Sequence, residues 1–527
     1  MDNTHKANLR SLYSMKNILF SLFLVLLFLS GCATNPVTGK KDFILVSESS
    51  EIDIGKQQYA PMRQSQGGDY TVDKELTAYV SEVGQKLAAV SDRKLPYEFK
   101  VLNNSVPNAW ALPGGKIVIN RGLLTELKDE AELAAVLGHE IVHAAARHGA
   151  LAMSRGMLMQ GAMLATVVAS QGEDYAQLAQ MGAGLGAKLI TTKNGRDAER
   201  EADFYGMEYM SRAGYDLQGA IDLQKTFVKL SEGRNENWLT GLFASHPPSR
   251  ERVENNIQTA AGRMAGGVRA KARFQSETAH IVNTKPAYEA YDKGRKALGD
   301  GKIDEARKLA RQALAGEPRE GHFYALLGDI ELKNKKPEAA KRYYDKAISL
   351  NDQFFYYHLQ RGLLNEQLGF TGDAKNDLDN SLKLLPTATA YNSLGNIARQ
   401  EGDIRLAKEH YARAAGNKDE LGKKAYSSLV ELDLADHPGK YIKIRNGLNR
   451  QGGVIAQIGN PTPKDMKDLV IGVEYPDGYG RTQRIQKPLA GILKAGTQEV
   501  IDLGTGKMSK EQLRRLKTGV IRANVVN

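Results

Sequence analysis

Small residues recur at a fixed period in the second half of this 527-residue chain. Four glycines, spaced 34, 34 and 33 residues apart, mark the pattern, and small residues follow each of them 12 and 19 positions later. The set comprises Gly294, Gly328, Gly362, Gly395, Ala306, Ala340, Ala374, Ala407, Ala313, Ala347, Ser381 and Ala414. Two helices cross closely only where side chains are small, so each unit is predicted to be a helical hairpin. The fixed period argues against helices that are merely rich in alanine.

These units resemble the tetratricopeptide repeat, which has a period of about 34 residues. Pro318 and Pro386 close two of the units. The resemblance implies an α-solenoid over residues 283–420 whose concave face binds a protein partner.

The first 31 residues have the pattern of a secretory signal peptide. Basic residues precede a twelve-residue apolar run, residues 18–29, and Met15 is an alternative start. A membrane-spanning anchor is the alternative, but the run is short for one. It ends in LSGC, which resembles the lipobox of bacterial lipoproteins and implies that Cys32 is acylated.

Cys32 is the only cysteine, so the chain has no internal disulfide and no cysteine-based metal site. By the same resemblance, Ala33 is not the aspartate that retains a lipoprotein in the inner membrane. We therefore expect a lipid anchor in the outer membrane, facing the periplasm. Export argues against nucleic acid as the partner of the +11 net charge, which is expected to meet anionic lipid headgroups or lipopolysaccharide instead.

The region before the repeats, residues 32–265, is predicted to be a mainly helical domain with a small β-sheet. A helix is expected with Leu76, Val80, Val83, Leu87 and Val90 on one face. Two strands are expected at Tyr97–Leu102 and Lys116–Asn120. A further helix starts at an apparent capping box in which Asp129 is the N-cap and Glu132 the third residue after it. 

The last region, residues 437–527, contains short β-rich runs separated by Gly, Pro and Asp, which is typical of a β-sandwich. The whole chain is thus expected to be an α+β multidomain protein.

An HExxH motif on the predicted helix carries the chemistry. His139 and His143 share one helix face, so both rings can reach one metal ion, and the Glu140 carboxylate can touch a metal-bound water. The alternative is two helix-face histidines beside a carboxylate. His148 lies nine residues after His139, and Ala144–Ala146 are expected to continue the helix, so His148 points half a turn away from the ligand face. His148 is therefore expected to be a structural or surface residue.

A catalytic zinc needs a third protein ligand. Glu199 and Asp203 lie one turn apart on a second predicted helix, where Glu199 can ligate zinc and Asp203 can hold the other nitrogen of a ligand histidine. Glu201 would point away from the metal. A solvated charged helix face is the alternative reading.

Residues 151–192 are rich in Met, Ala and Gly. Two alternatives remain for them: small-residue helices that pack in the core, or a mobile cover over the active region.

Four motifs together resemble the BepA/HtpX-type zinc metalloproteases, which are gluzincins related to the CAAX prenyl proteases: HEIVHAAARH, EREAD, NAWALPGG and HPPSRERV. The sequence CATNPVTGKKDFILVSESSEI is similar to the lipoprotein branch of that family. The resemblance covers residues 32 to about 260, and the repeats match the BepA architecture. The β-rich region at residues 437–527 has no counterpart in the BepA architecture.

The resemblance implies a role for each matching residue. His139, His143 and Glu199 would bind one Zn²⁺ per chain, with Glu140 as general base and Asp203 behind a ligand histidine. His246 would approach the metal, either to stabilise the oxyanion or to fill the fourth position in a latent form. Arg252 would be structural, and the strand Lys116–Asn120 would be the edge that pairs with extended substrate.

The implied function is a membrane-anchored zinc metalloendopeptidase that cuts unfolded or misassembled envelope proteins in periplasmic quality control. The alternative is a chaperone or scaffold for outer-membrane assembly whose repeats do the main work and whose zinc site is latent.

Overall fold

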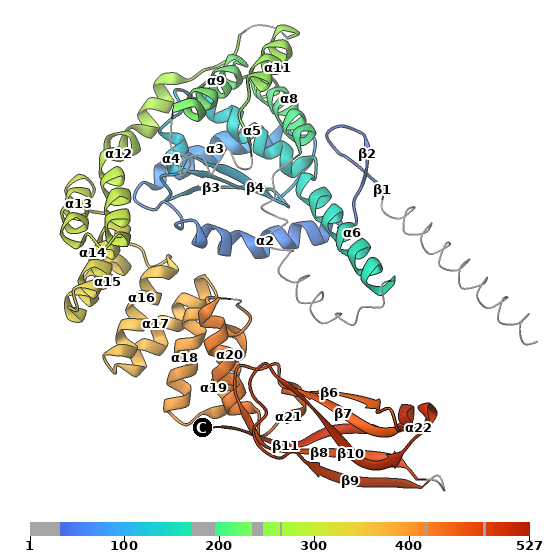
Figure 1. The fold of residues 1–527 in the computed structure, drawn as a ribbon. Coiled ribbons are helices and arrows are strands. Elements are labelled where there is room, and N and C mark those ends of the chain that lie inside the picture. Colours follow the sequence, from blue (N-terminus) through green and yellow to red (C-terminus); the bar gives the residue numbers. More distant parts are fainter. Residues whose placement is uncertain are drawn as a thin grey trace, which may run out of the picture. The chain divides into compact units, whose positions relative to one another are not determined.

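The computed structural model (Figure 1) describes the protein over residues 32–169, 195–233, 246–263, 266–417, 419–477 and 481–526. The chain divides into two compact units, Met1–Phe354 and Phe355–Asn527. The predicted signal peptide and most of the Met/Ala/Gly-rich segment lie outside the described residues. Over the part that is described, no helix combines the length and the apolar character that crossing a membrane requires. The expected domain limits stay predictions.

A three-stranded sheet organises the first unit. Its strands are β3 (Glu98–Leu102), β4 (Ala109–Leu112) and β5 (Lys116–Asn120), in the order β3-β5-β4. The strand pair β3–β5 is parallel and β4–β5 is antiparallel. The strand Lys116–Asn120 is therefore central, and the prediction that it forms the edge is wrong. The two edge strands are β3 and β4, and β4 is the one that contacts helix α5 (Glu130–Ala145).

Helices cover both faces of this sheet, which explains the continuous apolar run of β5. Ile117 and Ile119 pack in the main core with α3 (Lys74–Ala89) and α5. Val118 between them packs on the opposite face with Tyr59 of α2 (Glu48–Ser65). The helices of this part are α2 (Glu48–Ser65), α3 (Lys74–Ala89), α4 (Arg121–Leu124), α5 (Glu130–Ala145), α6 (His148–Ala169), α8 (Arg196–Arg212), α9 (Gln218–Gly233) and α11 (Arg250–Ala261). A short hairpin, β1 (Cys32–Thr34) with β2 (Lys41–Phe43), precedes them.

The predicted apolar face of α3 is confirmed. Leu76, Val80, Val83 and Leu87 are all buried in the core, and Val90 is the residue that caps the helix end. Since these side chains are spaced by three and four positions, the helical period alone placed them on one face.

The start of α5 is a modified capping box. Asp129 caps the helix by accepting a hydrogen bond from Glu132 N at 3.0 Å, as expected. Glu132 does not return a bond to Asp129; its Oε2 accepts from the backbone N of Lys128, one residue earlier, at 3.0 Å. The carboxyl group of Glu132 is fully buried as a result.

This burial predicts a pH-dependent stability. Burial raises the pKa of Glu132 to about 7, so the folded chain holds this proton more tightly than the unfolded chain. The contribution of protonated Glu132 to the free energy of unfolding is therefore complete below pH ~4.3 and is lost as the pH rises through 7. Between pH ~5 and ~8, the free energy of unfolding is expected to fall by about 2 kcal/mol less in Glu132→Gln than in wild type, because the amide cannot ionise. Thermal unfolding of the full chain measures the difference, with the exposed Glu75→Gln as control; equal pH dependence in all three proteins contradicts the expectation.

The repeat helices form antiparallel hairpins with the expected close contacts. A Cβ atom on Gly328 would lie 2.7 Å from the ring of Tyr344, and one on Gly395 would lie 2.8 Å from Tyr411. The helices are α12 (Lys271–Gly299), α13 (Ile303–Gly316), α14 (Gly321–Lys333) and α15 (Pro337–Leu350) in the first unit, and α16 (Phe355–Gln367), α17 (Thr371–Leu384), α18 (Ala388–Gln400), α19 (Ile404–Ala414) and α20 (Glu420–Asp433) in the second. The periodic alanines are fully buried, which confirms the helical hairpins.

The C-terminal region is β-rich, as predicted. Its strands are β6 (Lys443–Leu448), β7 (Gly453–Gly459), β8 (Met466–Pro476), β9 (Thr482–Pro488), β10 (Gln498–Lys507) and β11 (Lys517–Val525), with short helices α21 (Pro438–Tyr441) and α22 (Lys510–Arg515). They form two three-stranded antiparallel sheets, β10-β7-β6 and β11-β8-β9. Val454 and Ile458 from one sheet and Ile471 and Val473 from the other share one core, as in a sandwich.

Candidate metal centre

Helix α5 carries two histidines whose rings converge. The Nε2 atoms of His139 and His143 lie 3.1 Å apart, because residues four positions apart share a helix face. Their Nδ1 atoms face away from each other and contact other side chains: His139 Nδ1 is 3.0 Å from Asp203 Oδ1, and His143 Nδ1 is 2.8 Å from His148 Nδ1. Both rings thus have one nitrogen held and one nitrogen directed at a common centre.

Helix α8 brings Glu199 to this centre because α5 and α8 touch at two glycines. A Cβ on Gly206 would lie 3.0 Å from the backbone N of His139, and one on Gly138 would lie 3.1 Å from Gly206 O. Glu199 Oε1 is 3.4 Å from His143 Nε2, and Glu199 Oε2 is 3.5 Å from His139 Nε2. The structure therefore places the three sequence-predicted ligand residues together.

Asp203, one turn after Glu199, links His139 to Arg252 of α11. Arg252 donates to both carboxylate oxygens of Asp203 at 2.7 Å, and all three side chains are largely buried. Burial raises the pKa of Asp203, but Arg252 and His139 together lower it by more. The pKa of Asp203 is therefore below its usual value, and the group stays a carboxylate. The acceptor pins the His139 ring with Nε2 toward the centre.

His246 lies at the fourth corner of the cluster. Its Nδ1 is 3.0 Å from both oxygens of Glu199 and 3.2 Å from His139 Nε2, and its Nε2 is 3.5 Å from Glu140 Oε1. The donor atoms of His139, His143, Glu199 and His246 all lie within 4.8 Å of one another. His246 is thus within reach of the same metal ion as the other three donors.

These donors fit a tetrahedral zinc ion. A zinc about 2.0–2.1 Å from each donor needs neighbouring donors about 3.3 Å apart, and the observed separations are 3.1, 3.4 and 3.5 Å. Burial lowers the pKa of His143 well below its usual range, which keeps its ring in the neutral, metal-binding form. Burial also disfavours a charged His139, but Asp203 and Glu199 outweigh it and raise the pKa of His139 to about 10. A metal ion would take the place of that proton among the same groups.

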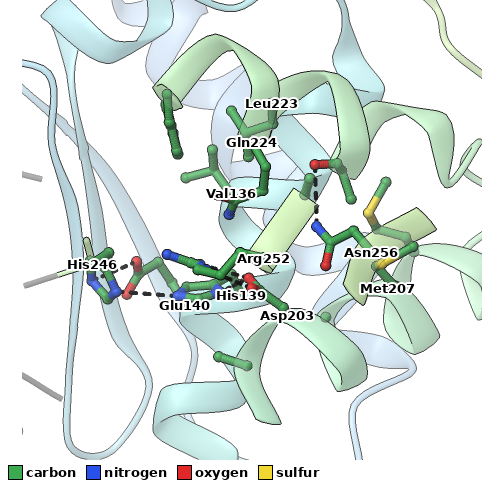
Figure 2. Close-up of a pocket in the computed structure, with 16 residues that line it drawn as sticks. Val136, His139, Glu140, Asp203, Met207, Leu223, Gln224, His246, Arg252 and Asn256 are labelled. Atoms are coloured by element: carbon green, nitrogen blue, oxygen red, sulfur yellow. Dashed lines mark hydrogen bonds and ion pairs between the residues drawn. The ribbon is translucent and has the colours of Figure 1, made fainter. Parts of the chain in front are cut away.

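Glu140 lies beside the donors and lines a small pocket of about 30 Å³ (Figure 2). Its side chain is buried, and burial raises its pKa despite the opposing charges of His246 and His139. Apolar side chains make most of the pocket wall: Ala135, Val136, Ala202, Met207, Met210, Ala220, Leu223 and Phe227. A raised pKa in a partly apolar pocket is typical of a carboxylate that acts as a base.

The position of His148 differs from the one predicted from the sequence. Helix α5 ends at Ala145 with Ala146 as its cap, and the chain turns at Arg147, whose φ is +63°, so the helix does not continue. His148 is buried and contacts His143, so a surface position is wrong and a structural position is right. Its Nε2 is 3.2 Å from Glu201, which points away from the donors as predicted. Nothing in the sequence indicated the contact between His148 and Glu201, apart from the presence of two titratable residues on predicted helices.

A buried donor set on two crossing helices, with a glutamate next to the first histidine, defines a metallopeptidase. Residues 74–260 match Peptidase family M48, and residues 291–353 and 388–433 match the tetratricopeptide repeat. Metalloprotease YcaL of Escherichia coli (strain K12) is 30% identical over 187 residues, covering 34% of this chain and 71% of that protein. The chain belongs to Peptidase family M48. It is a zinc metalloprotease with tetratricopeptide repeats.

Two further relatives share this domain. Beta-barrel assembly-enhancing protease of Escherichia coli (strain K12) is 28% identical over 334 residues, covering 56% of this chain and 67% of that protein. Mitochondrial metalloendopeptidase OMA1 of Schizosaccharomyces pombe (strain 972 / ATCC 24843) is 33% identical over 224 residues, covering 41% of this chain and 63% of that protein. The match to the first of these extends beyond the length of the protease domain.

Proposed function

We propose that this protein is a lipid-anchored zinc metalloendopeptidase of the periplasm, attached at the outer membrane through Cys32, that cuts unfolded or misassembled envelope proteins. The observation that carries the proposal is the buried cluster of His139, His143 and Glu199 beside Glu140. The beta-barrel assembly-enhancing protease of Escherichia coli, by its name, enhances the assembly of β-barrels, and this relation supports an envelope substrate.

In this proposal His139, His143 and Glu199 hold the zinc. When bound, zinc acidifies a coordinated water and polarises the scissile carbonyl. Glu140 accepts the proton of the attacking water and delivers it to the leaving nitrogen, for which a raised pKa suits it. Asp203 and Arg252 keep His139 oriented.

We propose that substrate adds as a strand beside β4, the edge strand next to α5, rather than beside β5. Strand addition uses the substrate backbone, so it selects extended and unfolded chain more than a particular side chain. The small apolar pocket next to Glu140 would then take one apolar substrate side chain. The tetratricopeptide repeats would hold a client or an assembly partner.

The test is cleavage of a urea-unfolded outer-membrane β-barrel protein by the purified full chain. We expect cleavage of the unfolded form, little cleavage of the same protein folded in detergent, and loss of cleavage when a chelator removes zinc. Cleavage that persists in the zinc-free protein contradicts the proposal. A Cys32→Ala variant expressed with its signal segment tests the anchor, since it should leave the membrane fraction.

The position of His246 favours a second candidate function, a chaperone or scaffold whose protease is latent. Its ring lies between Glu199 and Glu140, where a water and a substrate carbonyl would otherwise approach. On this arrangement we expect His246→Ala to raise the basal rate of peptide cleavage several-fold while zinc stoichiometry stays at one. A lower rate at unchanged zinc content would instead indicate that His246 stabilises the oxyanion.

A further inference from the structure

We infer that His148 and Glu201 are positioning residues for the zinc site, holding the ring of His143 through a directed pair of hydrogen bonds. The inference rests on the proposed ligand role of His143. His148 and Glu201 lie on the side of His143 that faces away from the donor cluster, and neither of them is proposed to bind the metal.

The contacts form a chain of buried groups. His143 Nδ1 lies 2.8 Å from His148 Nδ1, and the two rings meet edge to face with centroids 4.9 Å apart. His148 Nε2 lies 3.2 Å from Glu201 Oε2. Both imidazoles are buried, so neither can exchange these partners for water without leaving its place.

The direction of the hydrogen bonds follows from the metal-facing nitrogen. His143 presents Nε2 to the donor cluster, so that atom must keep its lone pair and Nδ1 must carry the hydrogen. His143 therefore donates to His148 Nδ1, which leaves the hydrogen of His148 on Nε2, where the Glu201 carboxylate accepts it. Each of the two rings has one tautomer and one orientation that satisfies both contacts.

The backbone is built to bring His148 to this point. An uninterrupted helix would turn His148 half a turn from the ligand face, but Arg147 adopts a left-handed conformation that interrupts the helix. Two buried hydrogen bonds hold Arg147 there, from Nε to Glu51 and from Nη2 to Val46 O, both at 2.8 Å. A strained residue kept by buried partners is a common mark of a functional position.

The two ligand histidines are thus supported differently. His139 is held by Asp203, a carboxylate in direct contact, and Asp203 is fixed by Arg252. His143 is held by a neutral imidazole, and the carboxylate stands one residue further out. Removing either outer member should loosen the His143 ring without removing a metal donor.

The experiment measures zinc affinity of the full chain by competition with a fluorescent chelator, together with the thermal stability of the zinc-free protein. His148→Phe fills the space but cannot accept a hydrogen bond, and we expect its zinc affinity to fall by about 10- to 100-fold. His148→Gln keeps an acceptor and should recover part of this loss. Glu201→Gln, on a partly exposed side chain, should show a smaller loss.

A second readout separates positioning from stability. In the cobalt-substituted protein, a displaced His143 should shift the visible ligand-field bands of His148→Phe and less so those of His148→Gln. His322→Phe is the matched control, since His322 is equally buried, has Nε2 2.9 Å from Gly67 O, and belongs to the repeat helix α14. The control is expected to lower stability without altering zinc affinity or the cobalt spectrum.

Wild-type zinc affinity in both His148→Phe and Glu201→Gln overturns the inference while leaving the proposed function intact. An equal loss of zinc affinity in His322→Phe also overturns it, because the effect would then follow general stability. If His148→Phe does not fold, His148→Gln and Glu201→Gln decide the question by the same criteria. A wild-type chain that binds no zinc overturns the proposed function and this inference together.

Discussion

Glu140→Gln is expected to bind one zinc per chain and to cleave unfolded protein more slowly by a factor of about 10² to 10⁴. The amide has the size of the carboxylate but cannot accept the proton of the attacking water. None of the three proposed ligands is touched, so zinc affinity should stay close to that of wild type. Metal analysis and single-turnover cleavage of the same preparation measure both quantities.

Glu130→Gln is the matched control for this substitution. Glu130 begins the same helix, is equally buried, and accepts hydrogen bonds from Tyr79 and Tyr215. The amide keeps one acceptor oxygen for one of the tyrosines, and its NH2 group can donate to the hydroxyl oxygen of the other, so the control should retain both zinc and cleavage. If Glu140→Gln cleaves as fast as wild type, the general-base assignment is wrong.

Glu199→Ala is expected to lose both zinc and activity, with zinc affinity falling by more than about 100-fold, beyond the loss typical of residues behind the ligands. The substitution leaves two of the three proposed ligands, and it also removes the carboxylate that His246 Nδ1 contacts at 3.0 Å, so His246 loses the group that holds it near the site. Isothermal titration of the zinc-free protein with zinc measures the affinity, and cleavage is followed in parallel.

Asp197→Ala is the control for the loss of an acidic residue on the same helix. Asp197 is fully exposed and pairs only with Arg200 among the contacts described for it, so its removal should change neither zinc binding nor cleavage. Normal zinc affinity in Glu199→Ala would exclude Glu199 as a ligand. The two glutamate variants are told apart by their zinc content, which only Glu199→Ala should lose.

The helical repeats could be predicted in detail because their determinants are local. A glycine in one helix and a large side chain in its partner, such as Gly328 with Tyr344 or Gly362 with Leu378, are separated by few residues and recur at a fixed period. The apolar face of α3 followed from the helical period in the same way. Neither feature depends on contacts with distant parts of the chain.

The sheet order could not be predicted, because alternation of side chains identifies a strand but not its neighbours. β5 is as apolar as a central strand should be, yet only the pairing with both β3 and β4 shows that it is not the edge. Burial of Ile117 and Val118 on opposite faces requires helices from separate parts of the sequence.

The sequence by itself determined the chemistry of this protein: two histidines and a glutamate on one helix, an acidic pair one turn apart on another, and the repeats that follow. Only the tertiary structure decided how these groups meet. Two facing glycines let α8 approach α5 until Glu199 reaches the histidines, and His246, just before α11, lies at the same point. The turn that aims His148 at His143 carries no glycine or proline as a signal, because Glu51, 96 residues away in sequence, holds Arg147 in place.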